Sequence, residues 1–405
     1  MGLSSIIKGG HPPTASGSAN DKAPEGAPED TEVLDEEPKN MLLAIVKQLS
    51  IGMDLSKITL PVFVLEPRSM LERITDFHSH PDILHGVSKL DSAEDRFLEV
   101  LRYYLAGWHI KPKGVKKPYN PILGEFFRCR YDYPDGSVAY YVAEQVSHHP
   151  PISAWYFASP DTDLELYGEL RPKSKFLGNS AATIMEGENK VKFLSRPEDG
   201  EYQITMPNMY ARGILFGKMV LELGDQAVVK NEETGLHCDI DFKTKGFFTG
   251  TYNAISGKLR GPKGEVGEIS GSWSDTMELS RKGHGKETFF DAHAEKVAAK
   301  TVAPEDKQAW NESRNLWIKV TAAIKAKDLD AATDAKTKIE DAQREAARQR
   351  DESGEKHQPR FFQLVDGWWH PKFEIPQGDV ASQTKAVRDF VYGDDFEPAL
   401  PPKKA

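Results

Sequence analysis

Two adjacent histidines, His148 and His149, are the residues of this chain best suited to chemistry, and two prolines follow them directly. A histidine pair can bind a metal ion, act as a base or bind an anion. Adjacent strand residues point to opposite faces, and this spacing matches no common zinc pattern. The prolines end strand pairing locally, which indicates the rim of a sheet. On these residues alone a structural role is favoured, and the functional roles stay open.

The elements that position the histidines are predicted to be strands. From about residue 119 to 291 the pattern has a period of two, as in Leu236–Lys243, where apolar and polar residues alternate throughout. Such alternation is typical of strands with one wet and one apolar face. Turn signals such as Pro134–Gly136 recur between the strands. Many short strands joined by short turns predict an antiparallel sandwich or barrel.

Segments of other character flank the predicted strands. Residues 1–40 are rich in Gly, Pro, Ser and Ala, and residues 20–40 carry eight acids against two lysines. We therefore expect a disordered acidic tail, which an anionic membrane would repel. The apolar run Met41–Met53 is either buried core, favoured on its pattern alone, or a mobile lid over a cavity. Helical spacing appears at residues 69–105 and 309–350.

Composition restricts the class of function. The chain has 405 residues, a net charge of −10 and two cysteines. The acidic balance argues against nucleic-acid binding, and the low cysteine count indicates a cytosolic protein without disulfides. No apolar run approaches the roughly 20 residues of a membrane-spanning helix, so we expect peripheral membrane contact. No nucleophile–base or metal arrangement is evident, so we expect neither an enzyme nor a bound cofactor.

Four sequence elements resemble the oxysterol-binding-protein-related family. They are Glu144–Pro151, Lys117–Glu125, Asp54–Pro61 and the trio Lys336, Glu340 and Arg344. The resemblance implies a mainly β (α+β) fold, a large near-complete antiparallel β-barrel that encloses a lipid tunnel, with an N-terminal lid and flanking helices. The implied segments are an acidic tail (1–40), lid and hinge (41–61), helical segment (62–118), barrel (119–295) and C-terminal helical subdomain with tail (296–405).

The resemblance also implies a ligand, phosphatidylinositol 4-phosphate, and residues for its head group. His148 and His149 would contact the monoester phosphate with Lys336 and Arg344. Lys117 and Asn120 would hold the other phosphate and the ring, whereas Glu125 and Glu340 would orient basic partners. On spacing alone, the trio Lys336, Glu340 and Arg344 is more typical of a solvated ion-pair ladder on one helix face.

The second ligand implied by the resemblance is phosphatidylserine, with sterol as the alternative. Segments Pro172–Ser180 and Arg212–Met219 resemble the fungal subgroup that exchanges phosphatidylserine. There, Ser174 would contact the serine head group. Leu55, Ile58 and Leu60 would contact the lid or the acyl chains. We expect a cytoplasmic monomer that transiently contacts anionic membranes at endoplasmic reticulum–plasma membrane contact sites. A phosphoinositide sensor or adaptor that moves no lipid is the alternative of a different class.

Overall fold

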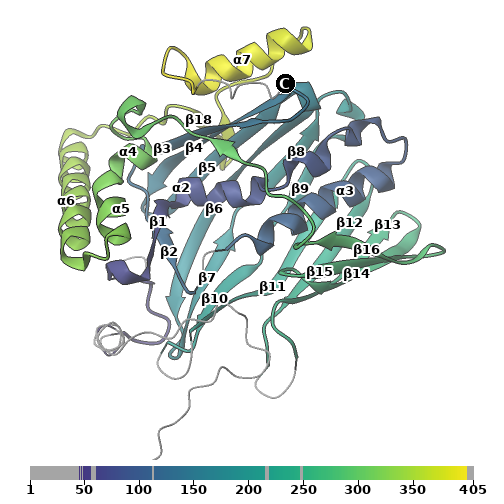
Figure 1. Cartoon of the computed structure of the whole chain (residues 1–405), viewed down its shortest axis with the longest axis horizontal. Coiled ribbons are helices and arrows are strands. Elements are labelled where there is room, and N and C mark those ends of the chain that lie inside the picture. Colours follow the sequence, from purple (N-terminus) through teal and green to yellow (C-terminus); the bar gives the residue numbers. More distant parts are fainter. Residues whose placement is uncertain are drawn as a thin grey trace, which may run out of the picture.

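The computed structural model describes residues 45, 47, 49–55, 61–111, 114–214, 219–246 and 250–398. At its centre is one sheet of 15 strands, all paired antiparallel, whose edge strands are β16 and β17 (Figure 1). The predicted antiparallel fold is therefore confirmed. The strands are β3 (Phe126–Asp132), β4 (Val138–His148), β5 (Pro151–Ser159), β6 (Leu164–Phe176), β7 (Ser180–Glu186), β8 (Asn189–Phe193), β9 (Tyr202–Ile204), β10 (Asn208–Arg212), β11 (Val220–Asn231), β12 (Leu236–Lys243), β13 (Ala254–Gly261), β14 (Gly264–Ser272), β15 (Thr276–Arg281), β16 (Gly285–Asp291) and β17 (Lys300–Thr301).

The two halves of the sheet differ in what covers them. In β12 the alternating sequence gives alternating burial, so one face meets the core and the other meets solvent. Strand β4 is instead buried along most of its length. Its inner side chains join the main core, and its outer ones pack beneath Phe361, Phe362 and the last helix. A strand covered on both faces reads as a continuous apolar run, which explains the sequence of β4.

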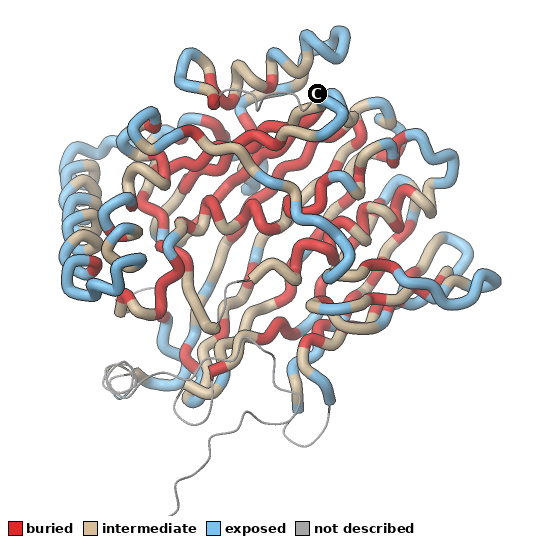
Figure 2. Tube along the Cα trace, in the orientation of Figure 1, coloured by how far each residue is buried: buried red, intermediate tan, exposed pale blue. Residues whose placement is uncertain are grey.

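Helices on the inner face of the sheet build the main core. Helix α3 (Ala93–Ala106) begins at the capping residue Ser92, whose hydroxyl accepts from the backbone N–H of Asp95. Its buried stripe packs with α2 (Met70–Arg73) against the strands (Figures 1 and 2). Short 3-10 turns join these elements: η2 (Val62–Val64), η3 (Ile74–His78), η4 (Pro81–Leu84), η5 (Val87–Lys89) and η6 (Gly107–His109).

The segment 62–118, expected to be helical, also contains two short strands. Strand β1 (Leu65–Ser69) pairs in parallel with β2 (Lys117–Tyr119), and Leu65 lies opposite Lys117. Strands this short show no readable alternation, so their sequence did not reveal them. The pairing places Lys117 directly beside the chain that follows the expected lid and hinge.

The C-terminal part adds helices and a hairpin outside the sheet. Helix α6 packs along α5 and begins at the capping residue Asp328. Its other side is largely exposed (Figure 2). Among the described residues no helix is long and apolar enough to span a bilayer. The elements are α4 (Ser313–Leu316), α5 (Ile318–Lys325), α6 (Leu329–Ser353), β18 (Phe362–Val365), β19 (Trp368–Pro371) and α7 (Val380–Tyr392), with the turns η7 (Pro160–Thr162), η8 (Pro197–Asp199) and η9 (Glu305–Lys307).

Candidate functional site

Two adjoining cavities of opposite character form the candidate site. One, of about 300 Å³, lies between the helices and the sheet and has a mainly apolar wall. The other, of about 700 Å³, lies beside α6 and has a largely polar and charged wall. Because residues of one short segment and of the β4 end line both, the cavities meet there. The shared residues are Lys117, Pro118, Tyr119, Asn120, His148 and His149.

Backbone pairing brings the two distinctive sequence motifs together. The N–H of Gly124 donates to the carbonyl of Gln145 at 2.9 Å, and the N–H of Gln145 donates to the carbonyl of Glu125 at 2.8 Å. Strand β4 ends at His148, and His149 already lies in a turn. The two imidazole rings are in contact, with centroids 4.6 Å apart. The expectation that they point to opposite faces is therefore wrong, because the strand ends between them.

The ring of His148 is oriented by the backbone of the neighbouring segment. Its Nδ1 lies 3.1 Å from the carbonyl oxygen of Pro121. Because a carbonyl only accepts, Nδ1 carries the proton and Nε2 remains for a ligand. Burial lowers the pKa of His148, and the neighbouring His149 lowers it further. An anion in the cavity would reverse this effect by stabilising the protonated ring.

Lys117 is a cation that lacks a counter-charge. Among the residues described by the structure, no carboxylate forms an ion pair with it. Burial lowers the pKa of Lys117, and the positive charge of Lys336 adds to this effect. Four basic side chains line the polar cavity against two acidic ones, besides three histidines. They are Lys117, Lys336, Arg344 and Arg350 against Glu340 and Asp351. The wall therefore carries an excess of two positive charges, which suits an anionic ligand.

The basic cavity brings together seven of the eight residues predicted for the head group. These are Lys117, Asn120, His148, His149, Lys336, Glu340 and Arg344. Lys336 donates to Glu340 at 2.5 Å. The eighth residue, Ser174, lies on β6 and lines the apolar cavity instead. Its hydroxyl lies 3.2 Å from that of Thr183 on the neighbouring strand.

The described part of the expected lid covers the apolar cavity. Leu55 is buried and lines it, together with Ile45 and Leu49. Backbone hydrogen bonds tie this segment to the end of β6: the N–H of Gly52 donates to Phe176 at 2.7 Å, and the N–H of Phe176 donates to Met53 at 3.0 Å. The other two predicted lid contacts, Ile58 and Leu60, lie outside the described residues, as does the acidic tail.

Glu125 has a different role from the predicted one. Its buried carboxylate accepts from the hydroxyls of Ser69 and Ser313, the indole N–H of Trp317 and the backbone N–H of Ile122. Burial raises its pKa despite these donors. None of them is basic, so the prediction that Glu125 orients basic partners is wrong. The residue instead ties β1, α4 and the junction between α4 and α5 to the segment that carries Asn120.

Sequence reasoning did not assign Gln343, Arg350, Asp351 and His357 to the site, although they line the basic cavity. The first three continue the α6 face that carries Lys336 and Glu340, at helical spacing, so the pattern could have revealed them. His357 follows the end of the helix at Gly354, which adopts the left-handed conformation with φ of 70°. No periodic signal marks a residue that reaches a site after such a reversal.

Comparison with known proteins identifies the family. A family model described as oxysterol-binding protein matches residues 41–383. An oxysterol-binding protein homolog of Schizosaccharomyces pombe is 47% identical over 364 residues, covering 86% of this chain and 76% of the relative. Oxysterol-binding protein homolog 7 of Saccharomyces cerevisiae is 46% identical over 338 residues, covering 81% and 76%.

Solved structures share the fold. The Osh1 ORD domain in complex with cholesterol superposes with a TM-score of 0.67 at 23% identity, covering 89% of this chain and 91% of that chain. The Osh3 ORD of Saccharomyces cerevisiae in complex with PI(4)P gives 0.65 at 21% identity, covering 86% and 93%. This chain therefore belongs to the oxysterol-binding protein family and forms that family's lipid-transfer domain.

Proposed function

We propose that this protein extracts one lipid at a time and exchanges phosphatidylserine for phosphatidylinositol 4-phosphate between membranes. One observation carries the proposal: an apolar cavity and a basic cavity share the six residues where they meet. A single lipid would place its acyl chains in the first and its head group in the second. Two lipids cannot use Lys117, Asn120 and the histidines at once, so their binding is mutually exclusive and permits exchange.

The apolar cavity serves the acyl chains. A diacyl lipid hides roughly 30 methylenes, each worth about 0.8 kcal/mol when removed from water. Since the bilayer already hides them, the protein need only offer an equally dry environment. Leu49 and Leu55 cover the described wall on the lid side. Extraction then depends on matching the bilayer interior, and selection among lipids depends on the head group.

The charge of the basic cavity favours phosphatidylinositol 4-phosphate. Its monoester phosphate carries close to two negative charges, which equals the positive excess of the cavity wall. Hydrogen bonds from charged donors to phosphate are the strong ones. The related Osh3 ORD has been solved with PI(4)P, which supports the same ligand for this chain.

Phosphatidylserine is the second ligand that we propose, on the resemblance of the Ser174 segment and on the place of that residue in the apolar cavity wall. A sterol is the competing cargo. Trp273 lies in the apolar cavity wall, and among the described residues its buried indole N–H has no hydrogen-bond partner, which a sterol hydroxyl would supply. The Osh1 ORD domain has been solved with sterols.

The resemblance to the subgroup also supports a proposed cellular location and oligomeric state. The protein would act as a cytoplasmic monomer, peripheral at endoplasmic reticulum–plasma membrane contact sites, with transient contact to anionic membranes. No metal or other cofactor enters the proposed cycle. The segment Asp54–Pro61, which resembles the family's hinge segment, is proposed as the hinge on which the lid opens.

A two-liposome transfer assay tests the function. Phosphatidylserine should leave donor liposomes faster when acceptors contain phosphatidylinositol 4-phosphate, and the double variant His148→Ala, His149→Ala should abolish this acceleration. His293→Ala, at a strongly exposed position outside both cavities, is the matched control. Binding of the phosphoinositide without transfer would favour a sensor. Sterol in place of phosphatidylserine among co-purified lipids would favour the sterol exchanger.

A further inference from the structure

Two histidines outside the candidate site converge from separate elements. His80 directly precedes η4, and His109 ends η6. Their Nε2 atoms lie 2.8 Å apart. Both rings also contact Phe290 of β16, with centroid distances of 5.2 Å and 5.8 Å. Neither histidine lines the apolar or the basic cavity, so lipid binding does not account for their approach.

The tautomer of His80 is set by its other ring nitrogen. His80 donates a hydrogen bond to the backbone carbonyl of Lys296. Because Nε2 faces His109, the donor in this bond is Nδ1, and Nε2 of His80 carries a lone pair. Histidines that bind metal ions commonly have this arrangement, in which a carbonyl or carboxylate holds one ring nitrogen and the other nitrogen faces the ion.

Both rings are neutral near pH 7. Burial lowers the pKa of His80, although the nearby Asp82 and Glu295 act in the opposite direction. Burial, together with the nearby His80 and His293, lowers the pKa of His109 to about 4. Neutral imidazole is the form that binds a metal ion, since protons compete for the same lone pair. Protons therefore do not block the pair at neutral pH.

The close approach of the two nitrogens requires a positive centre between them. Two lone pairs 2.8 Å apart would repel each other, so in the free protein His109 donates its Nε2 proton to His80. A metal ion would take the place of this proton, and His109 would carry its proton on Nδ1 instead. Ligand nitrogens of a tetrahedral zinc ion lie roughly 3.3 Å apart, so the rings need to separate by only about 0.5 Å.

Acidic side chains lie near the pair and can complete the coordination. Asp82 and Glu295 are close enough to act on His80, and both are exposed. Within the described part of the chain, no three potential ligands already surround one metal position. The two histidines are thus the fixed ligands, and an exposed carboxylate or water has to supply the others. A carboxylate would also offset part of the charge of the ion.

We propose that His80 and His109 form a binding site for a transition-metal ion such as Zn²⁺, completed by Glu295 and water. Imidazole nitrogen suits Zn²⁺, whereas Mg²⁺ and Ca²⁺ prefer oxygen ligands. The ion would join η6 to the segment that follows β16. Because Gly107 and Trp108 of η6 line the apolar cavity, the ion would also fix this part of the cavity wall. The inference does not depend on the proposed lipid exchange.

Calorimetric titration of the full chain, without a histidine tag, with Zn²⁺ tests the site. We expect one ion per chain and an affinity at least about tenfold lower in His109→Phe, since even indirect metal contacts contribute that much. Phenylalanine keeps an aromatic ring against Phe290. His284→Phe, at an exposed position between β15 and β16, is the matched control and should bind Zn²⁺ like the unmodified protein. Zn²⁺ should raise the unfolding temperature of the control and not of His109→Phe.

The histidines at the cavity rim are the competing ligands for the ion. X-ray absorption of the zinc complex of the double variant His148→Ala, His149→Ala should still show two imidazole ligands. This measurement leaves His80 and His109 unchanged, so it decides the question even if His109→Phe does not fold. Loss of zinc binding in the double variant would assign the ion to the rim and overturn the inference. Absence of saturable zinc binding in the unmodified protein would also overturn it, because the pair would then form only a hydrogen bond.

Discussion

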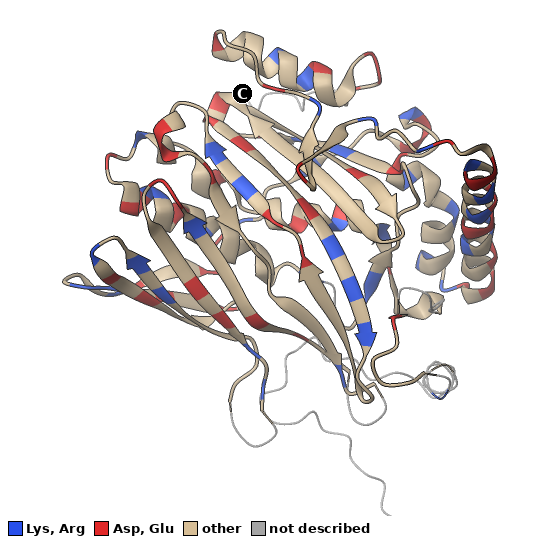
Figure 3. Ribbon diagram, turned by 180° about the vertical axis from the view of Figure 1, so that it is seen from behind, with Lys and Arg blue, Asp and Glu red and all other residues tan. Residues whose placement is uncertain are grey.

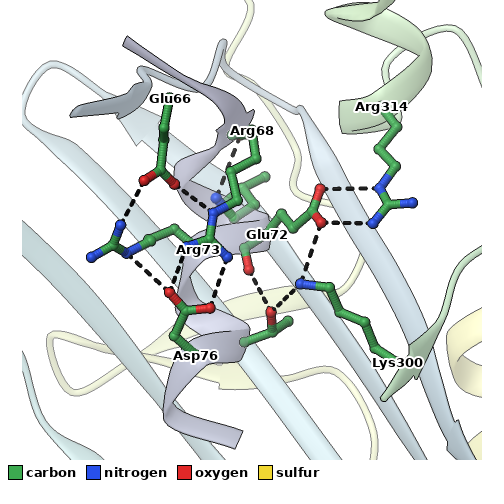
Figure 4. Close-up of polar contacts among 10 residues, drawn as sticks. Glu66, Arg68, Glu72, Arg73, Asp76, Lys300 and Arg314 are labelled. Atoms are coloured by element: carbon green, nitrogen blue, oxygen red, sulfur yellow. Dashed lines mark hydrogen bonds and ion pairs between the residues drawn. The ribbon is translucent and has the colours of Figure 1, made fainter. Parts of the chain in front are cut away.

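Two charged clusters of this molecule differ in how their charges are paired. Beside α2, Arg68 and Arg73 each contact both Glu66 and Asp76, at N–O distances of 2.5 to 3.1 Å (Figure 4). Glu72 in the same region pairs with Arg314 at 2.7 Å and Lys300 at 3.3 Å (Figure 4). In the head-group cavity, Lys117 and Arg350 have no such partner among the described residues.

The pKa values follow this difference in pairing. Burial acts to raise the pKa of Glu72, but Arg314 and Lys300 outweigh it and hold the carboxyl below its usual value. Burial lowers the pKa of Lys117, and a second cation adds to that effect. The first cluster therefore gains stability from its charges, whereas the cavity holds charges that favour a bound anion. Arg73 and Asp76 line the apolar cavity as a neutralised pair.

The largest expected effect comes from breaking the paired cluster. Glu72→Ala leaves Arg314 and Lys300 without their carboxylate, and removing one partner of a buried ion pair costs about 3 kcal/mol of unfolding free energy. Urea denaturation measures this loss. Glu186→Ala removes an exposed pair with Lys173 and should cost less than about 0.5 kcal/mol. If the unfolding free energy of Glu72→Ala fell by as little as in this control, the structural role of the cluster would be contradicted.

Removing a charge from the head-group cavity should weaken lipid binding without lowering the unfolding free energy. Lys117→Met removes a charge that the folded, empty protein holds at a cost, so the unfolding free energy should stay constant or rise by up to about 1 kcal/mol. Affinity for phosphatidylinositol 4-phosphate should fall about tenfold to hundredfold with the lost charged hydrogen bond. Titration of lipid in liposomes gives the affinity. Lys173→Met, at an exposed position, is the control. A lower unfolding free energy in Lys117→Met would mean that Lys117 stabilises the fold, as the paired residues beside α2 do.

Local patterns sufficed to predict much of both the fold and the site. Alternation predicted the strands because one face of a strand such as β12 is wet. Short, dense motifs predicted Lys117 and His148, which pairing of the adjoining chain then brings together. Spacing on α6, a helix rich in basic and acidic residues (Figure 3), also contained the signal for Arg350, about four turns beyond its first basic cavity residue Lys336, although the prediction stopped at Arg344.

Features that depend on distant residues could not be predicted in this way. Glu125 was expected to orient basic neighbours, but its partners Ser313 and Trp317 lie 188 and 192 residues away in sequence. His357 reaches the cavity because the chain turns back after α6. Whether a lysine pairs with a carboxylate also depends on the fold. Among the described residues Lys300 pairs with a carboxylate and Lys117 does not, and the sequence gives no sign of this difference.

A change of pH should alter the lipid affinity of the head-group cavity by a smaller amount. The pKa of His148 lies below its usual value in the empty protein, and a phosphate dianion would raise it. Between these two pKa values the complex binds one proton more than the free protein. Affinity for phosphatidylinositol 4-phosphate should therefore fall as the pH rises through that window, by at most about tenfold per unit. Calorimetric titration should show a flatter profile in His148→Asn, and identical profiles would show that this ring takes up no proton.

The smallest expected effect belongs to Ser174, whose hydroxyl already contacts that of Thr183 in the empty protein. A phosphatidylserine head group would have to displace the existing Thr183 contact, so we expect the net contribution of the Ser174 hydroxyl to be about 0.5 kcal/mol. Ser174→Ala should thus slow phosphatidylserine transfer only about twofold to threefold, with less change for the phosphoinositide. Thr183→Val frees the hydroxyl of Ser174 and should leave phosphatidylserine transfer unchanged or faster. The loss of lipid binding in Ser174→Ala could instead be as large as in Lys117→Met. That result would mean that an existing partner does not limit what a polar group contributes to binding, and it would remove the physical basis of the contrast between the two clusters.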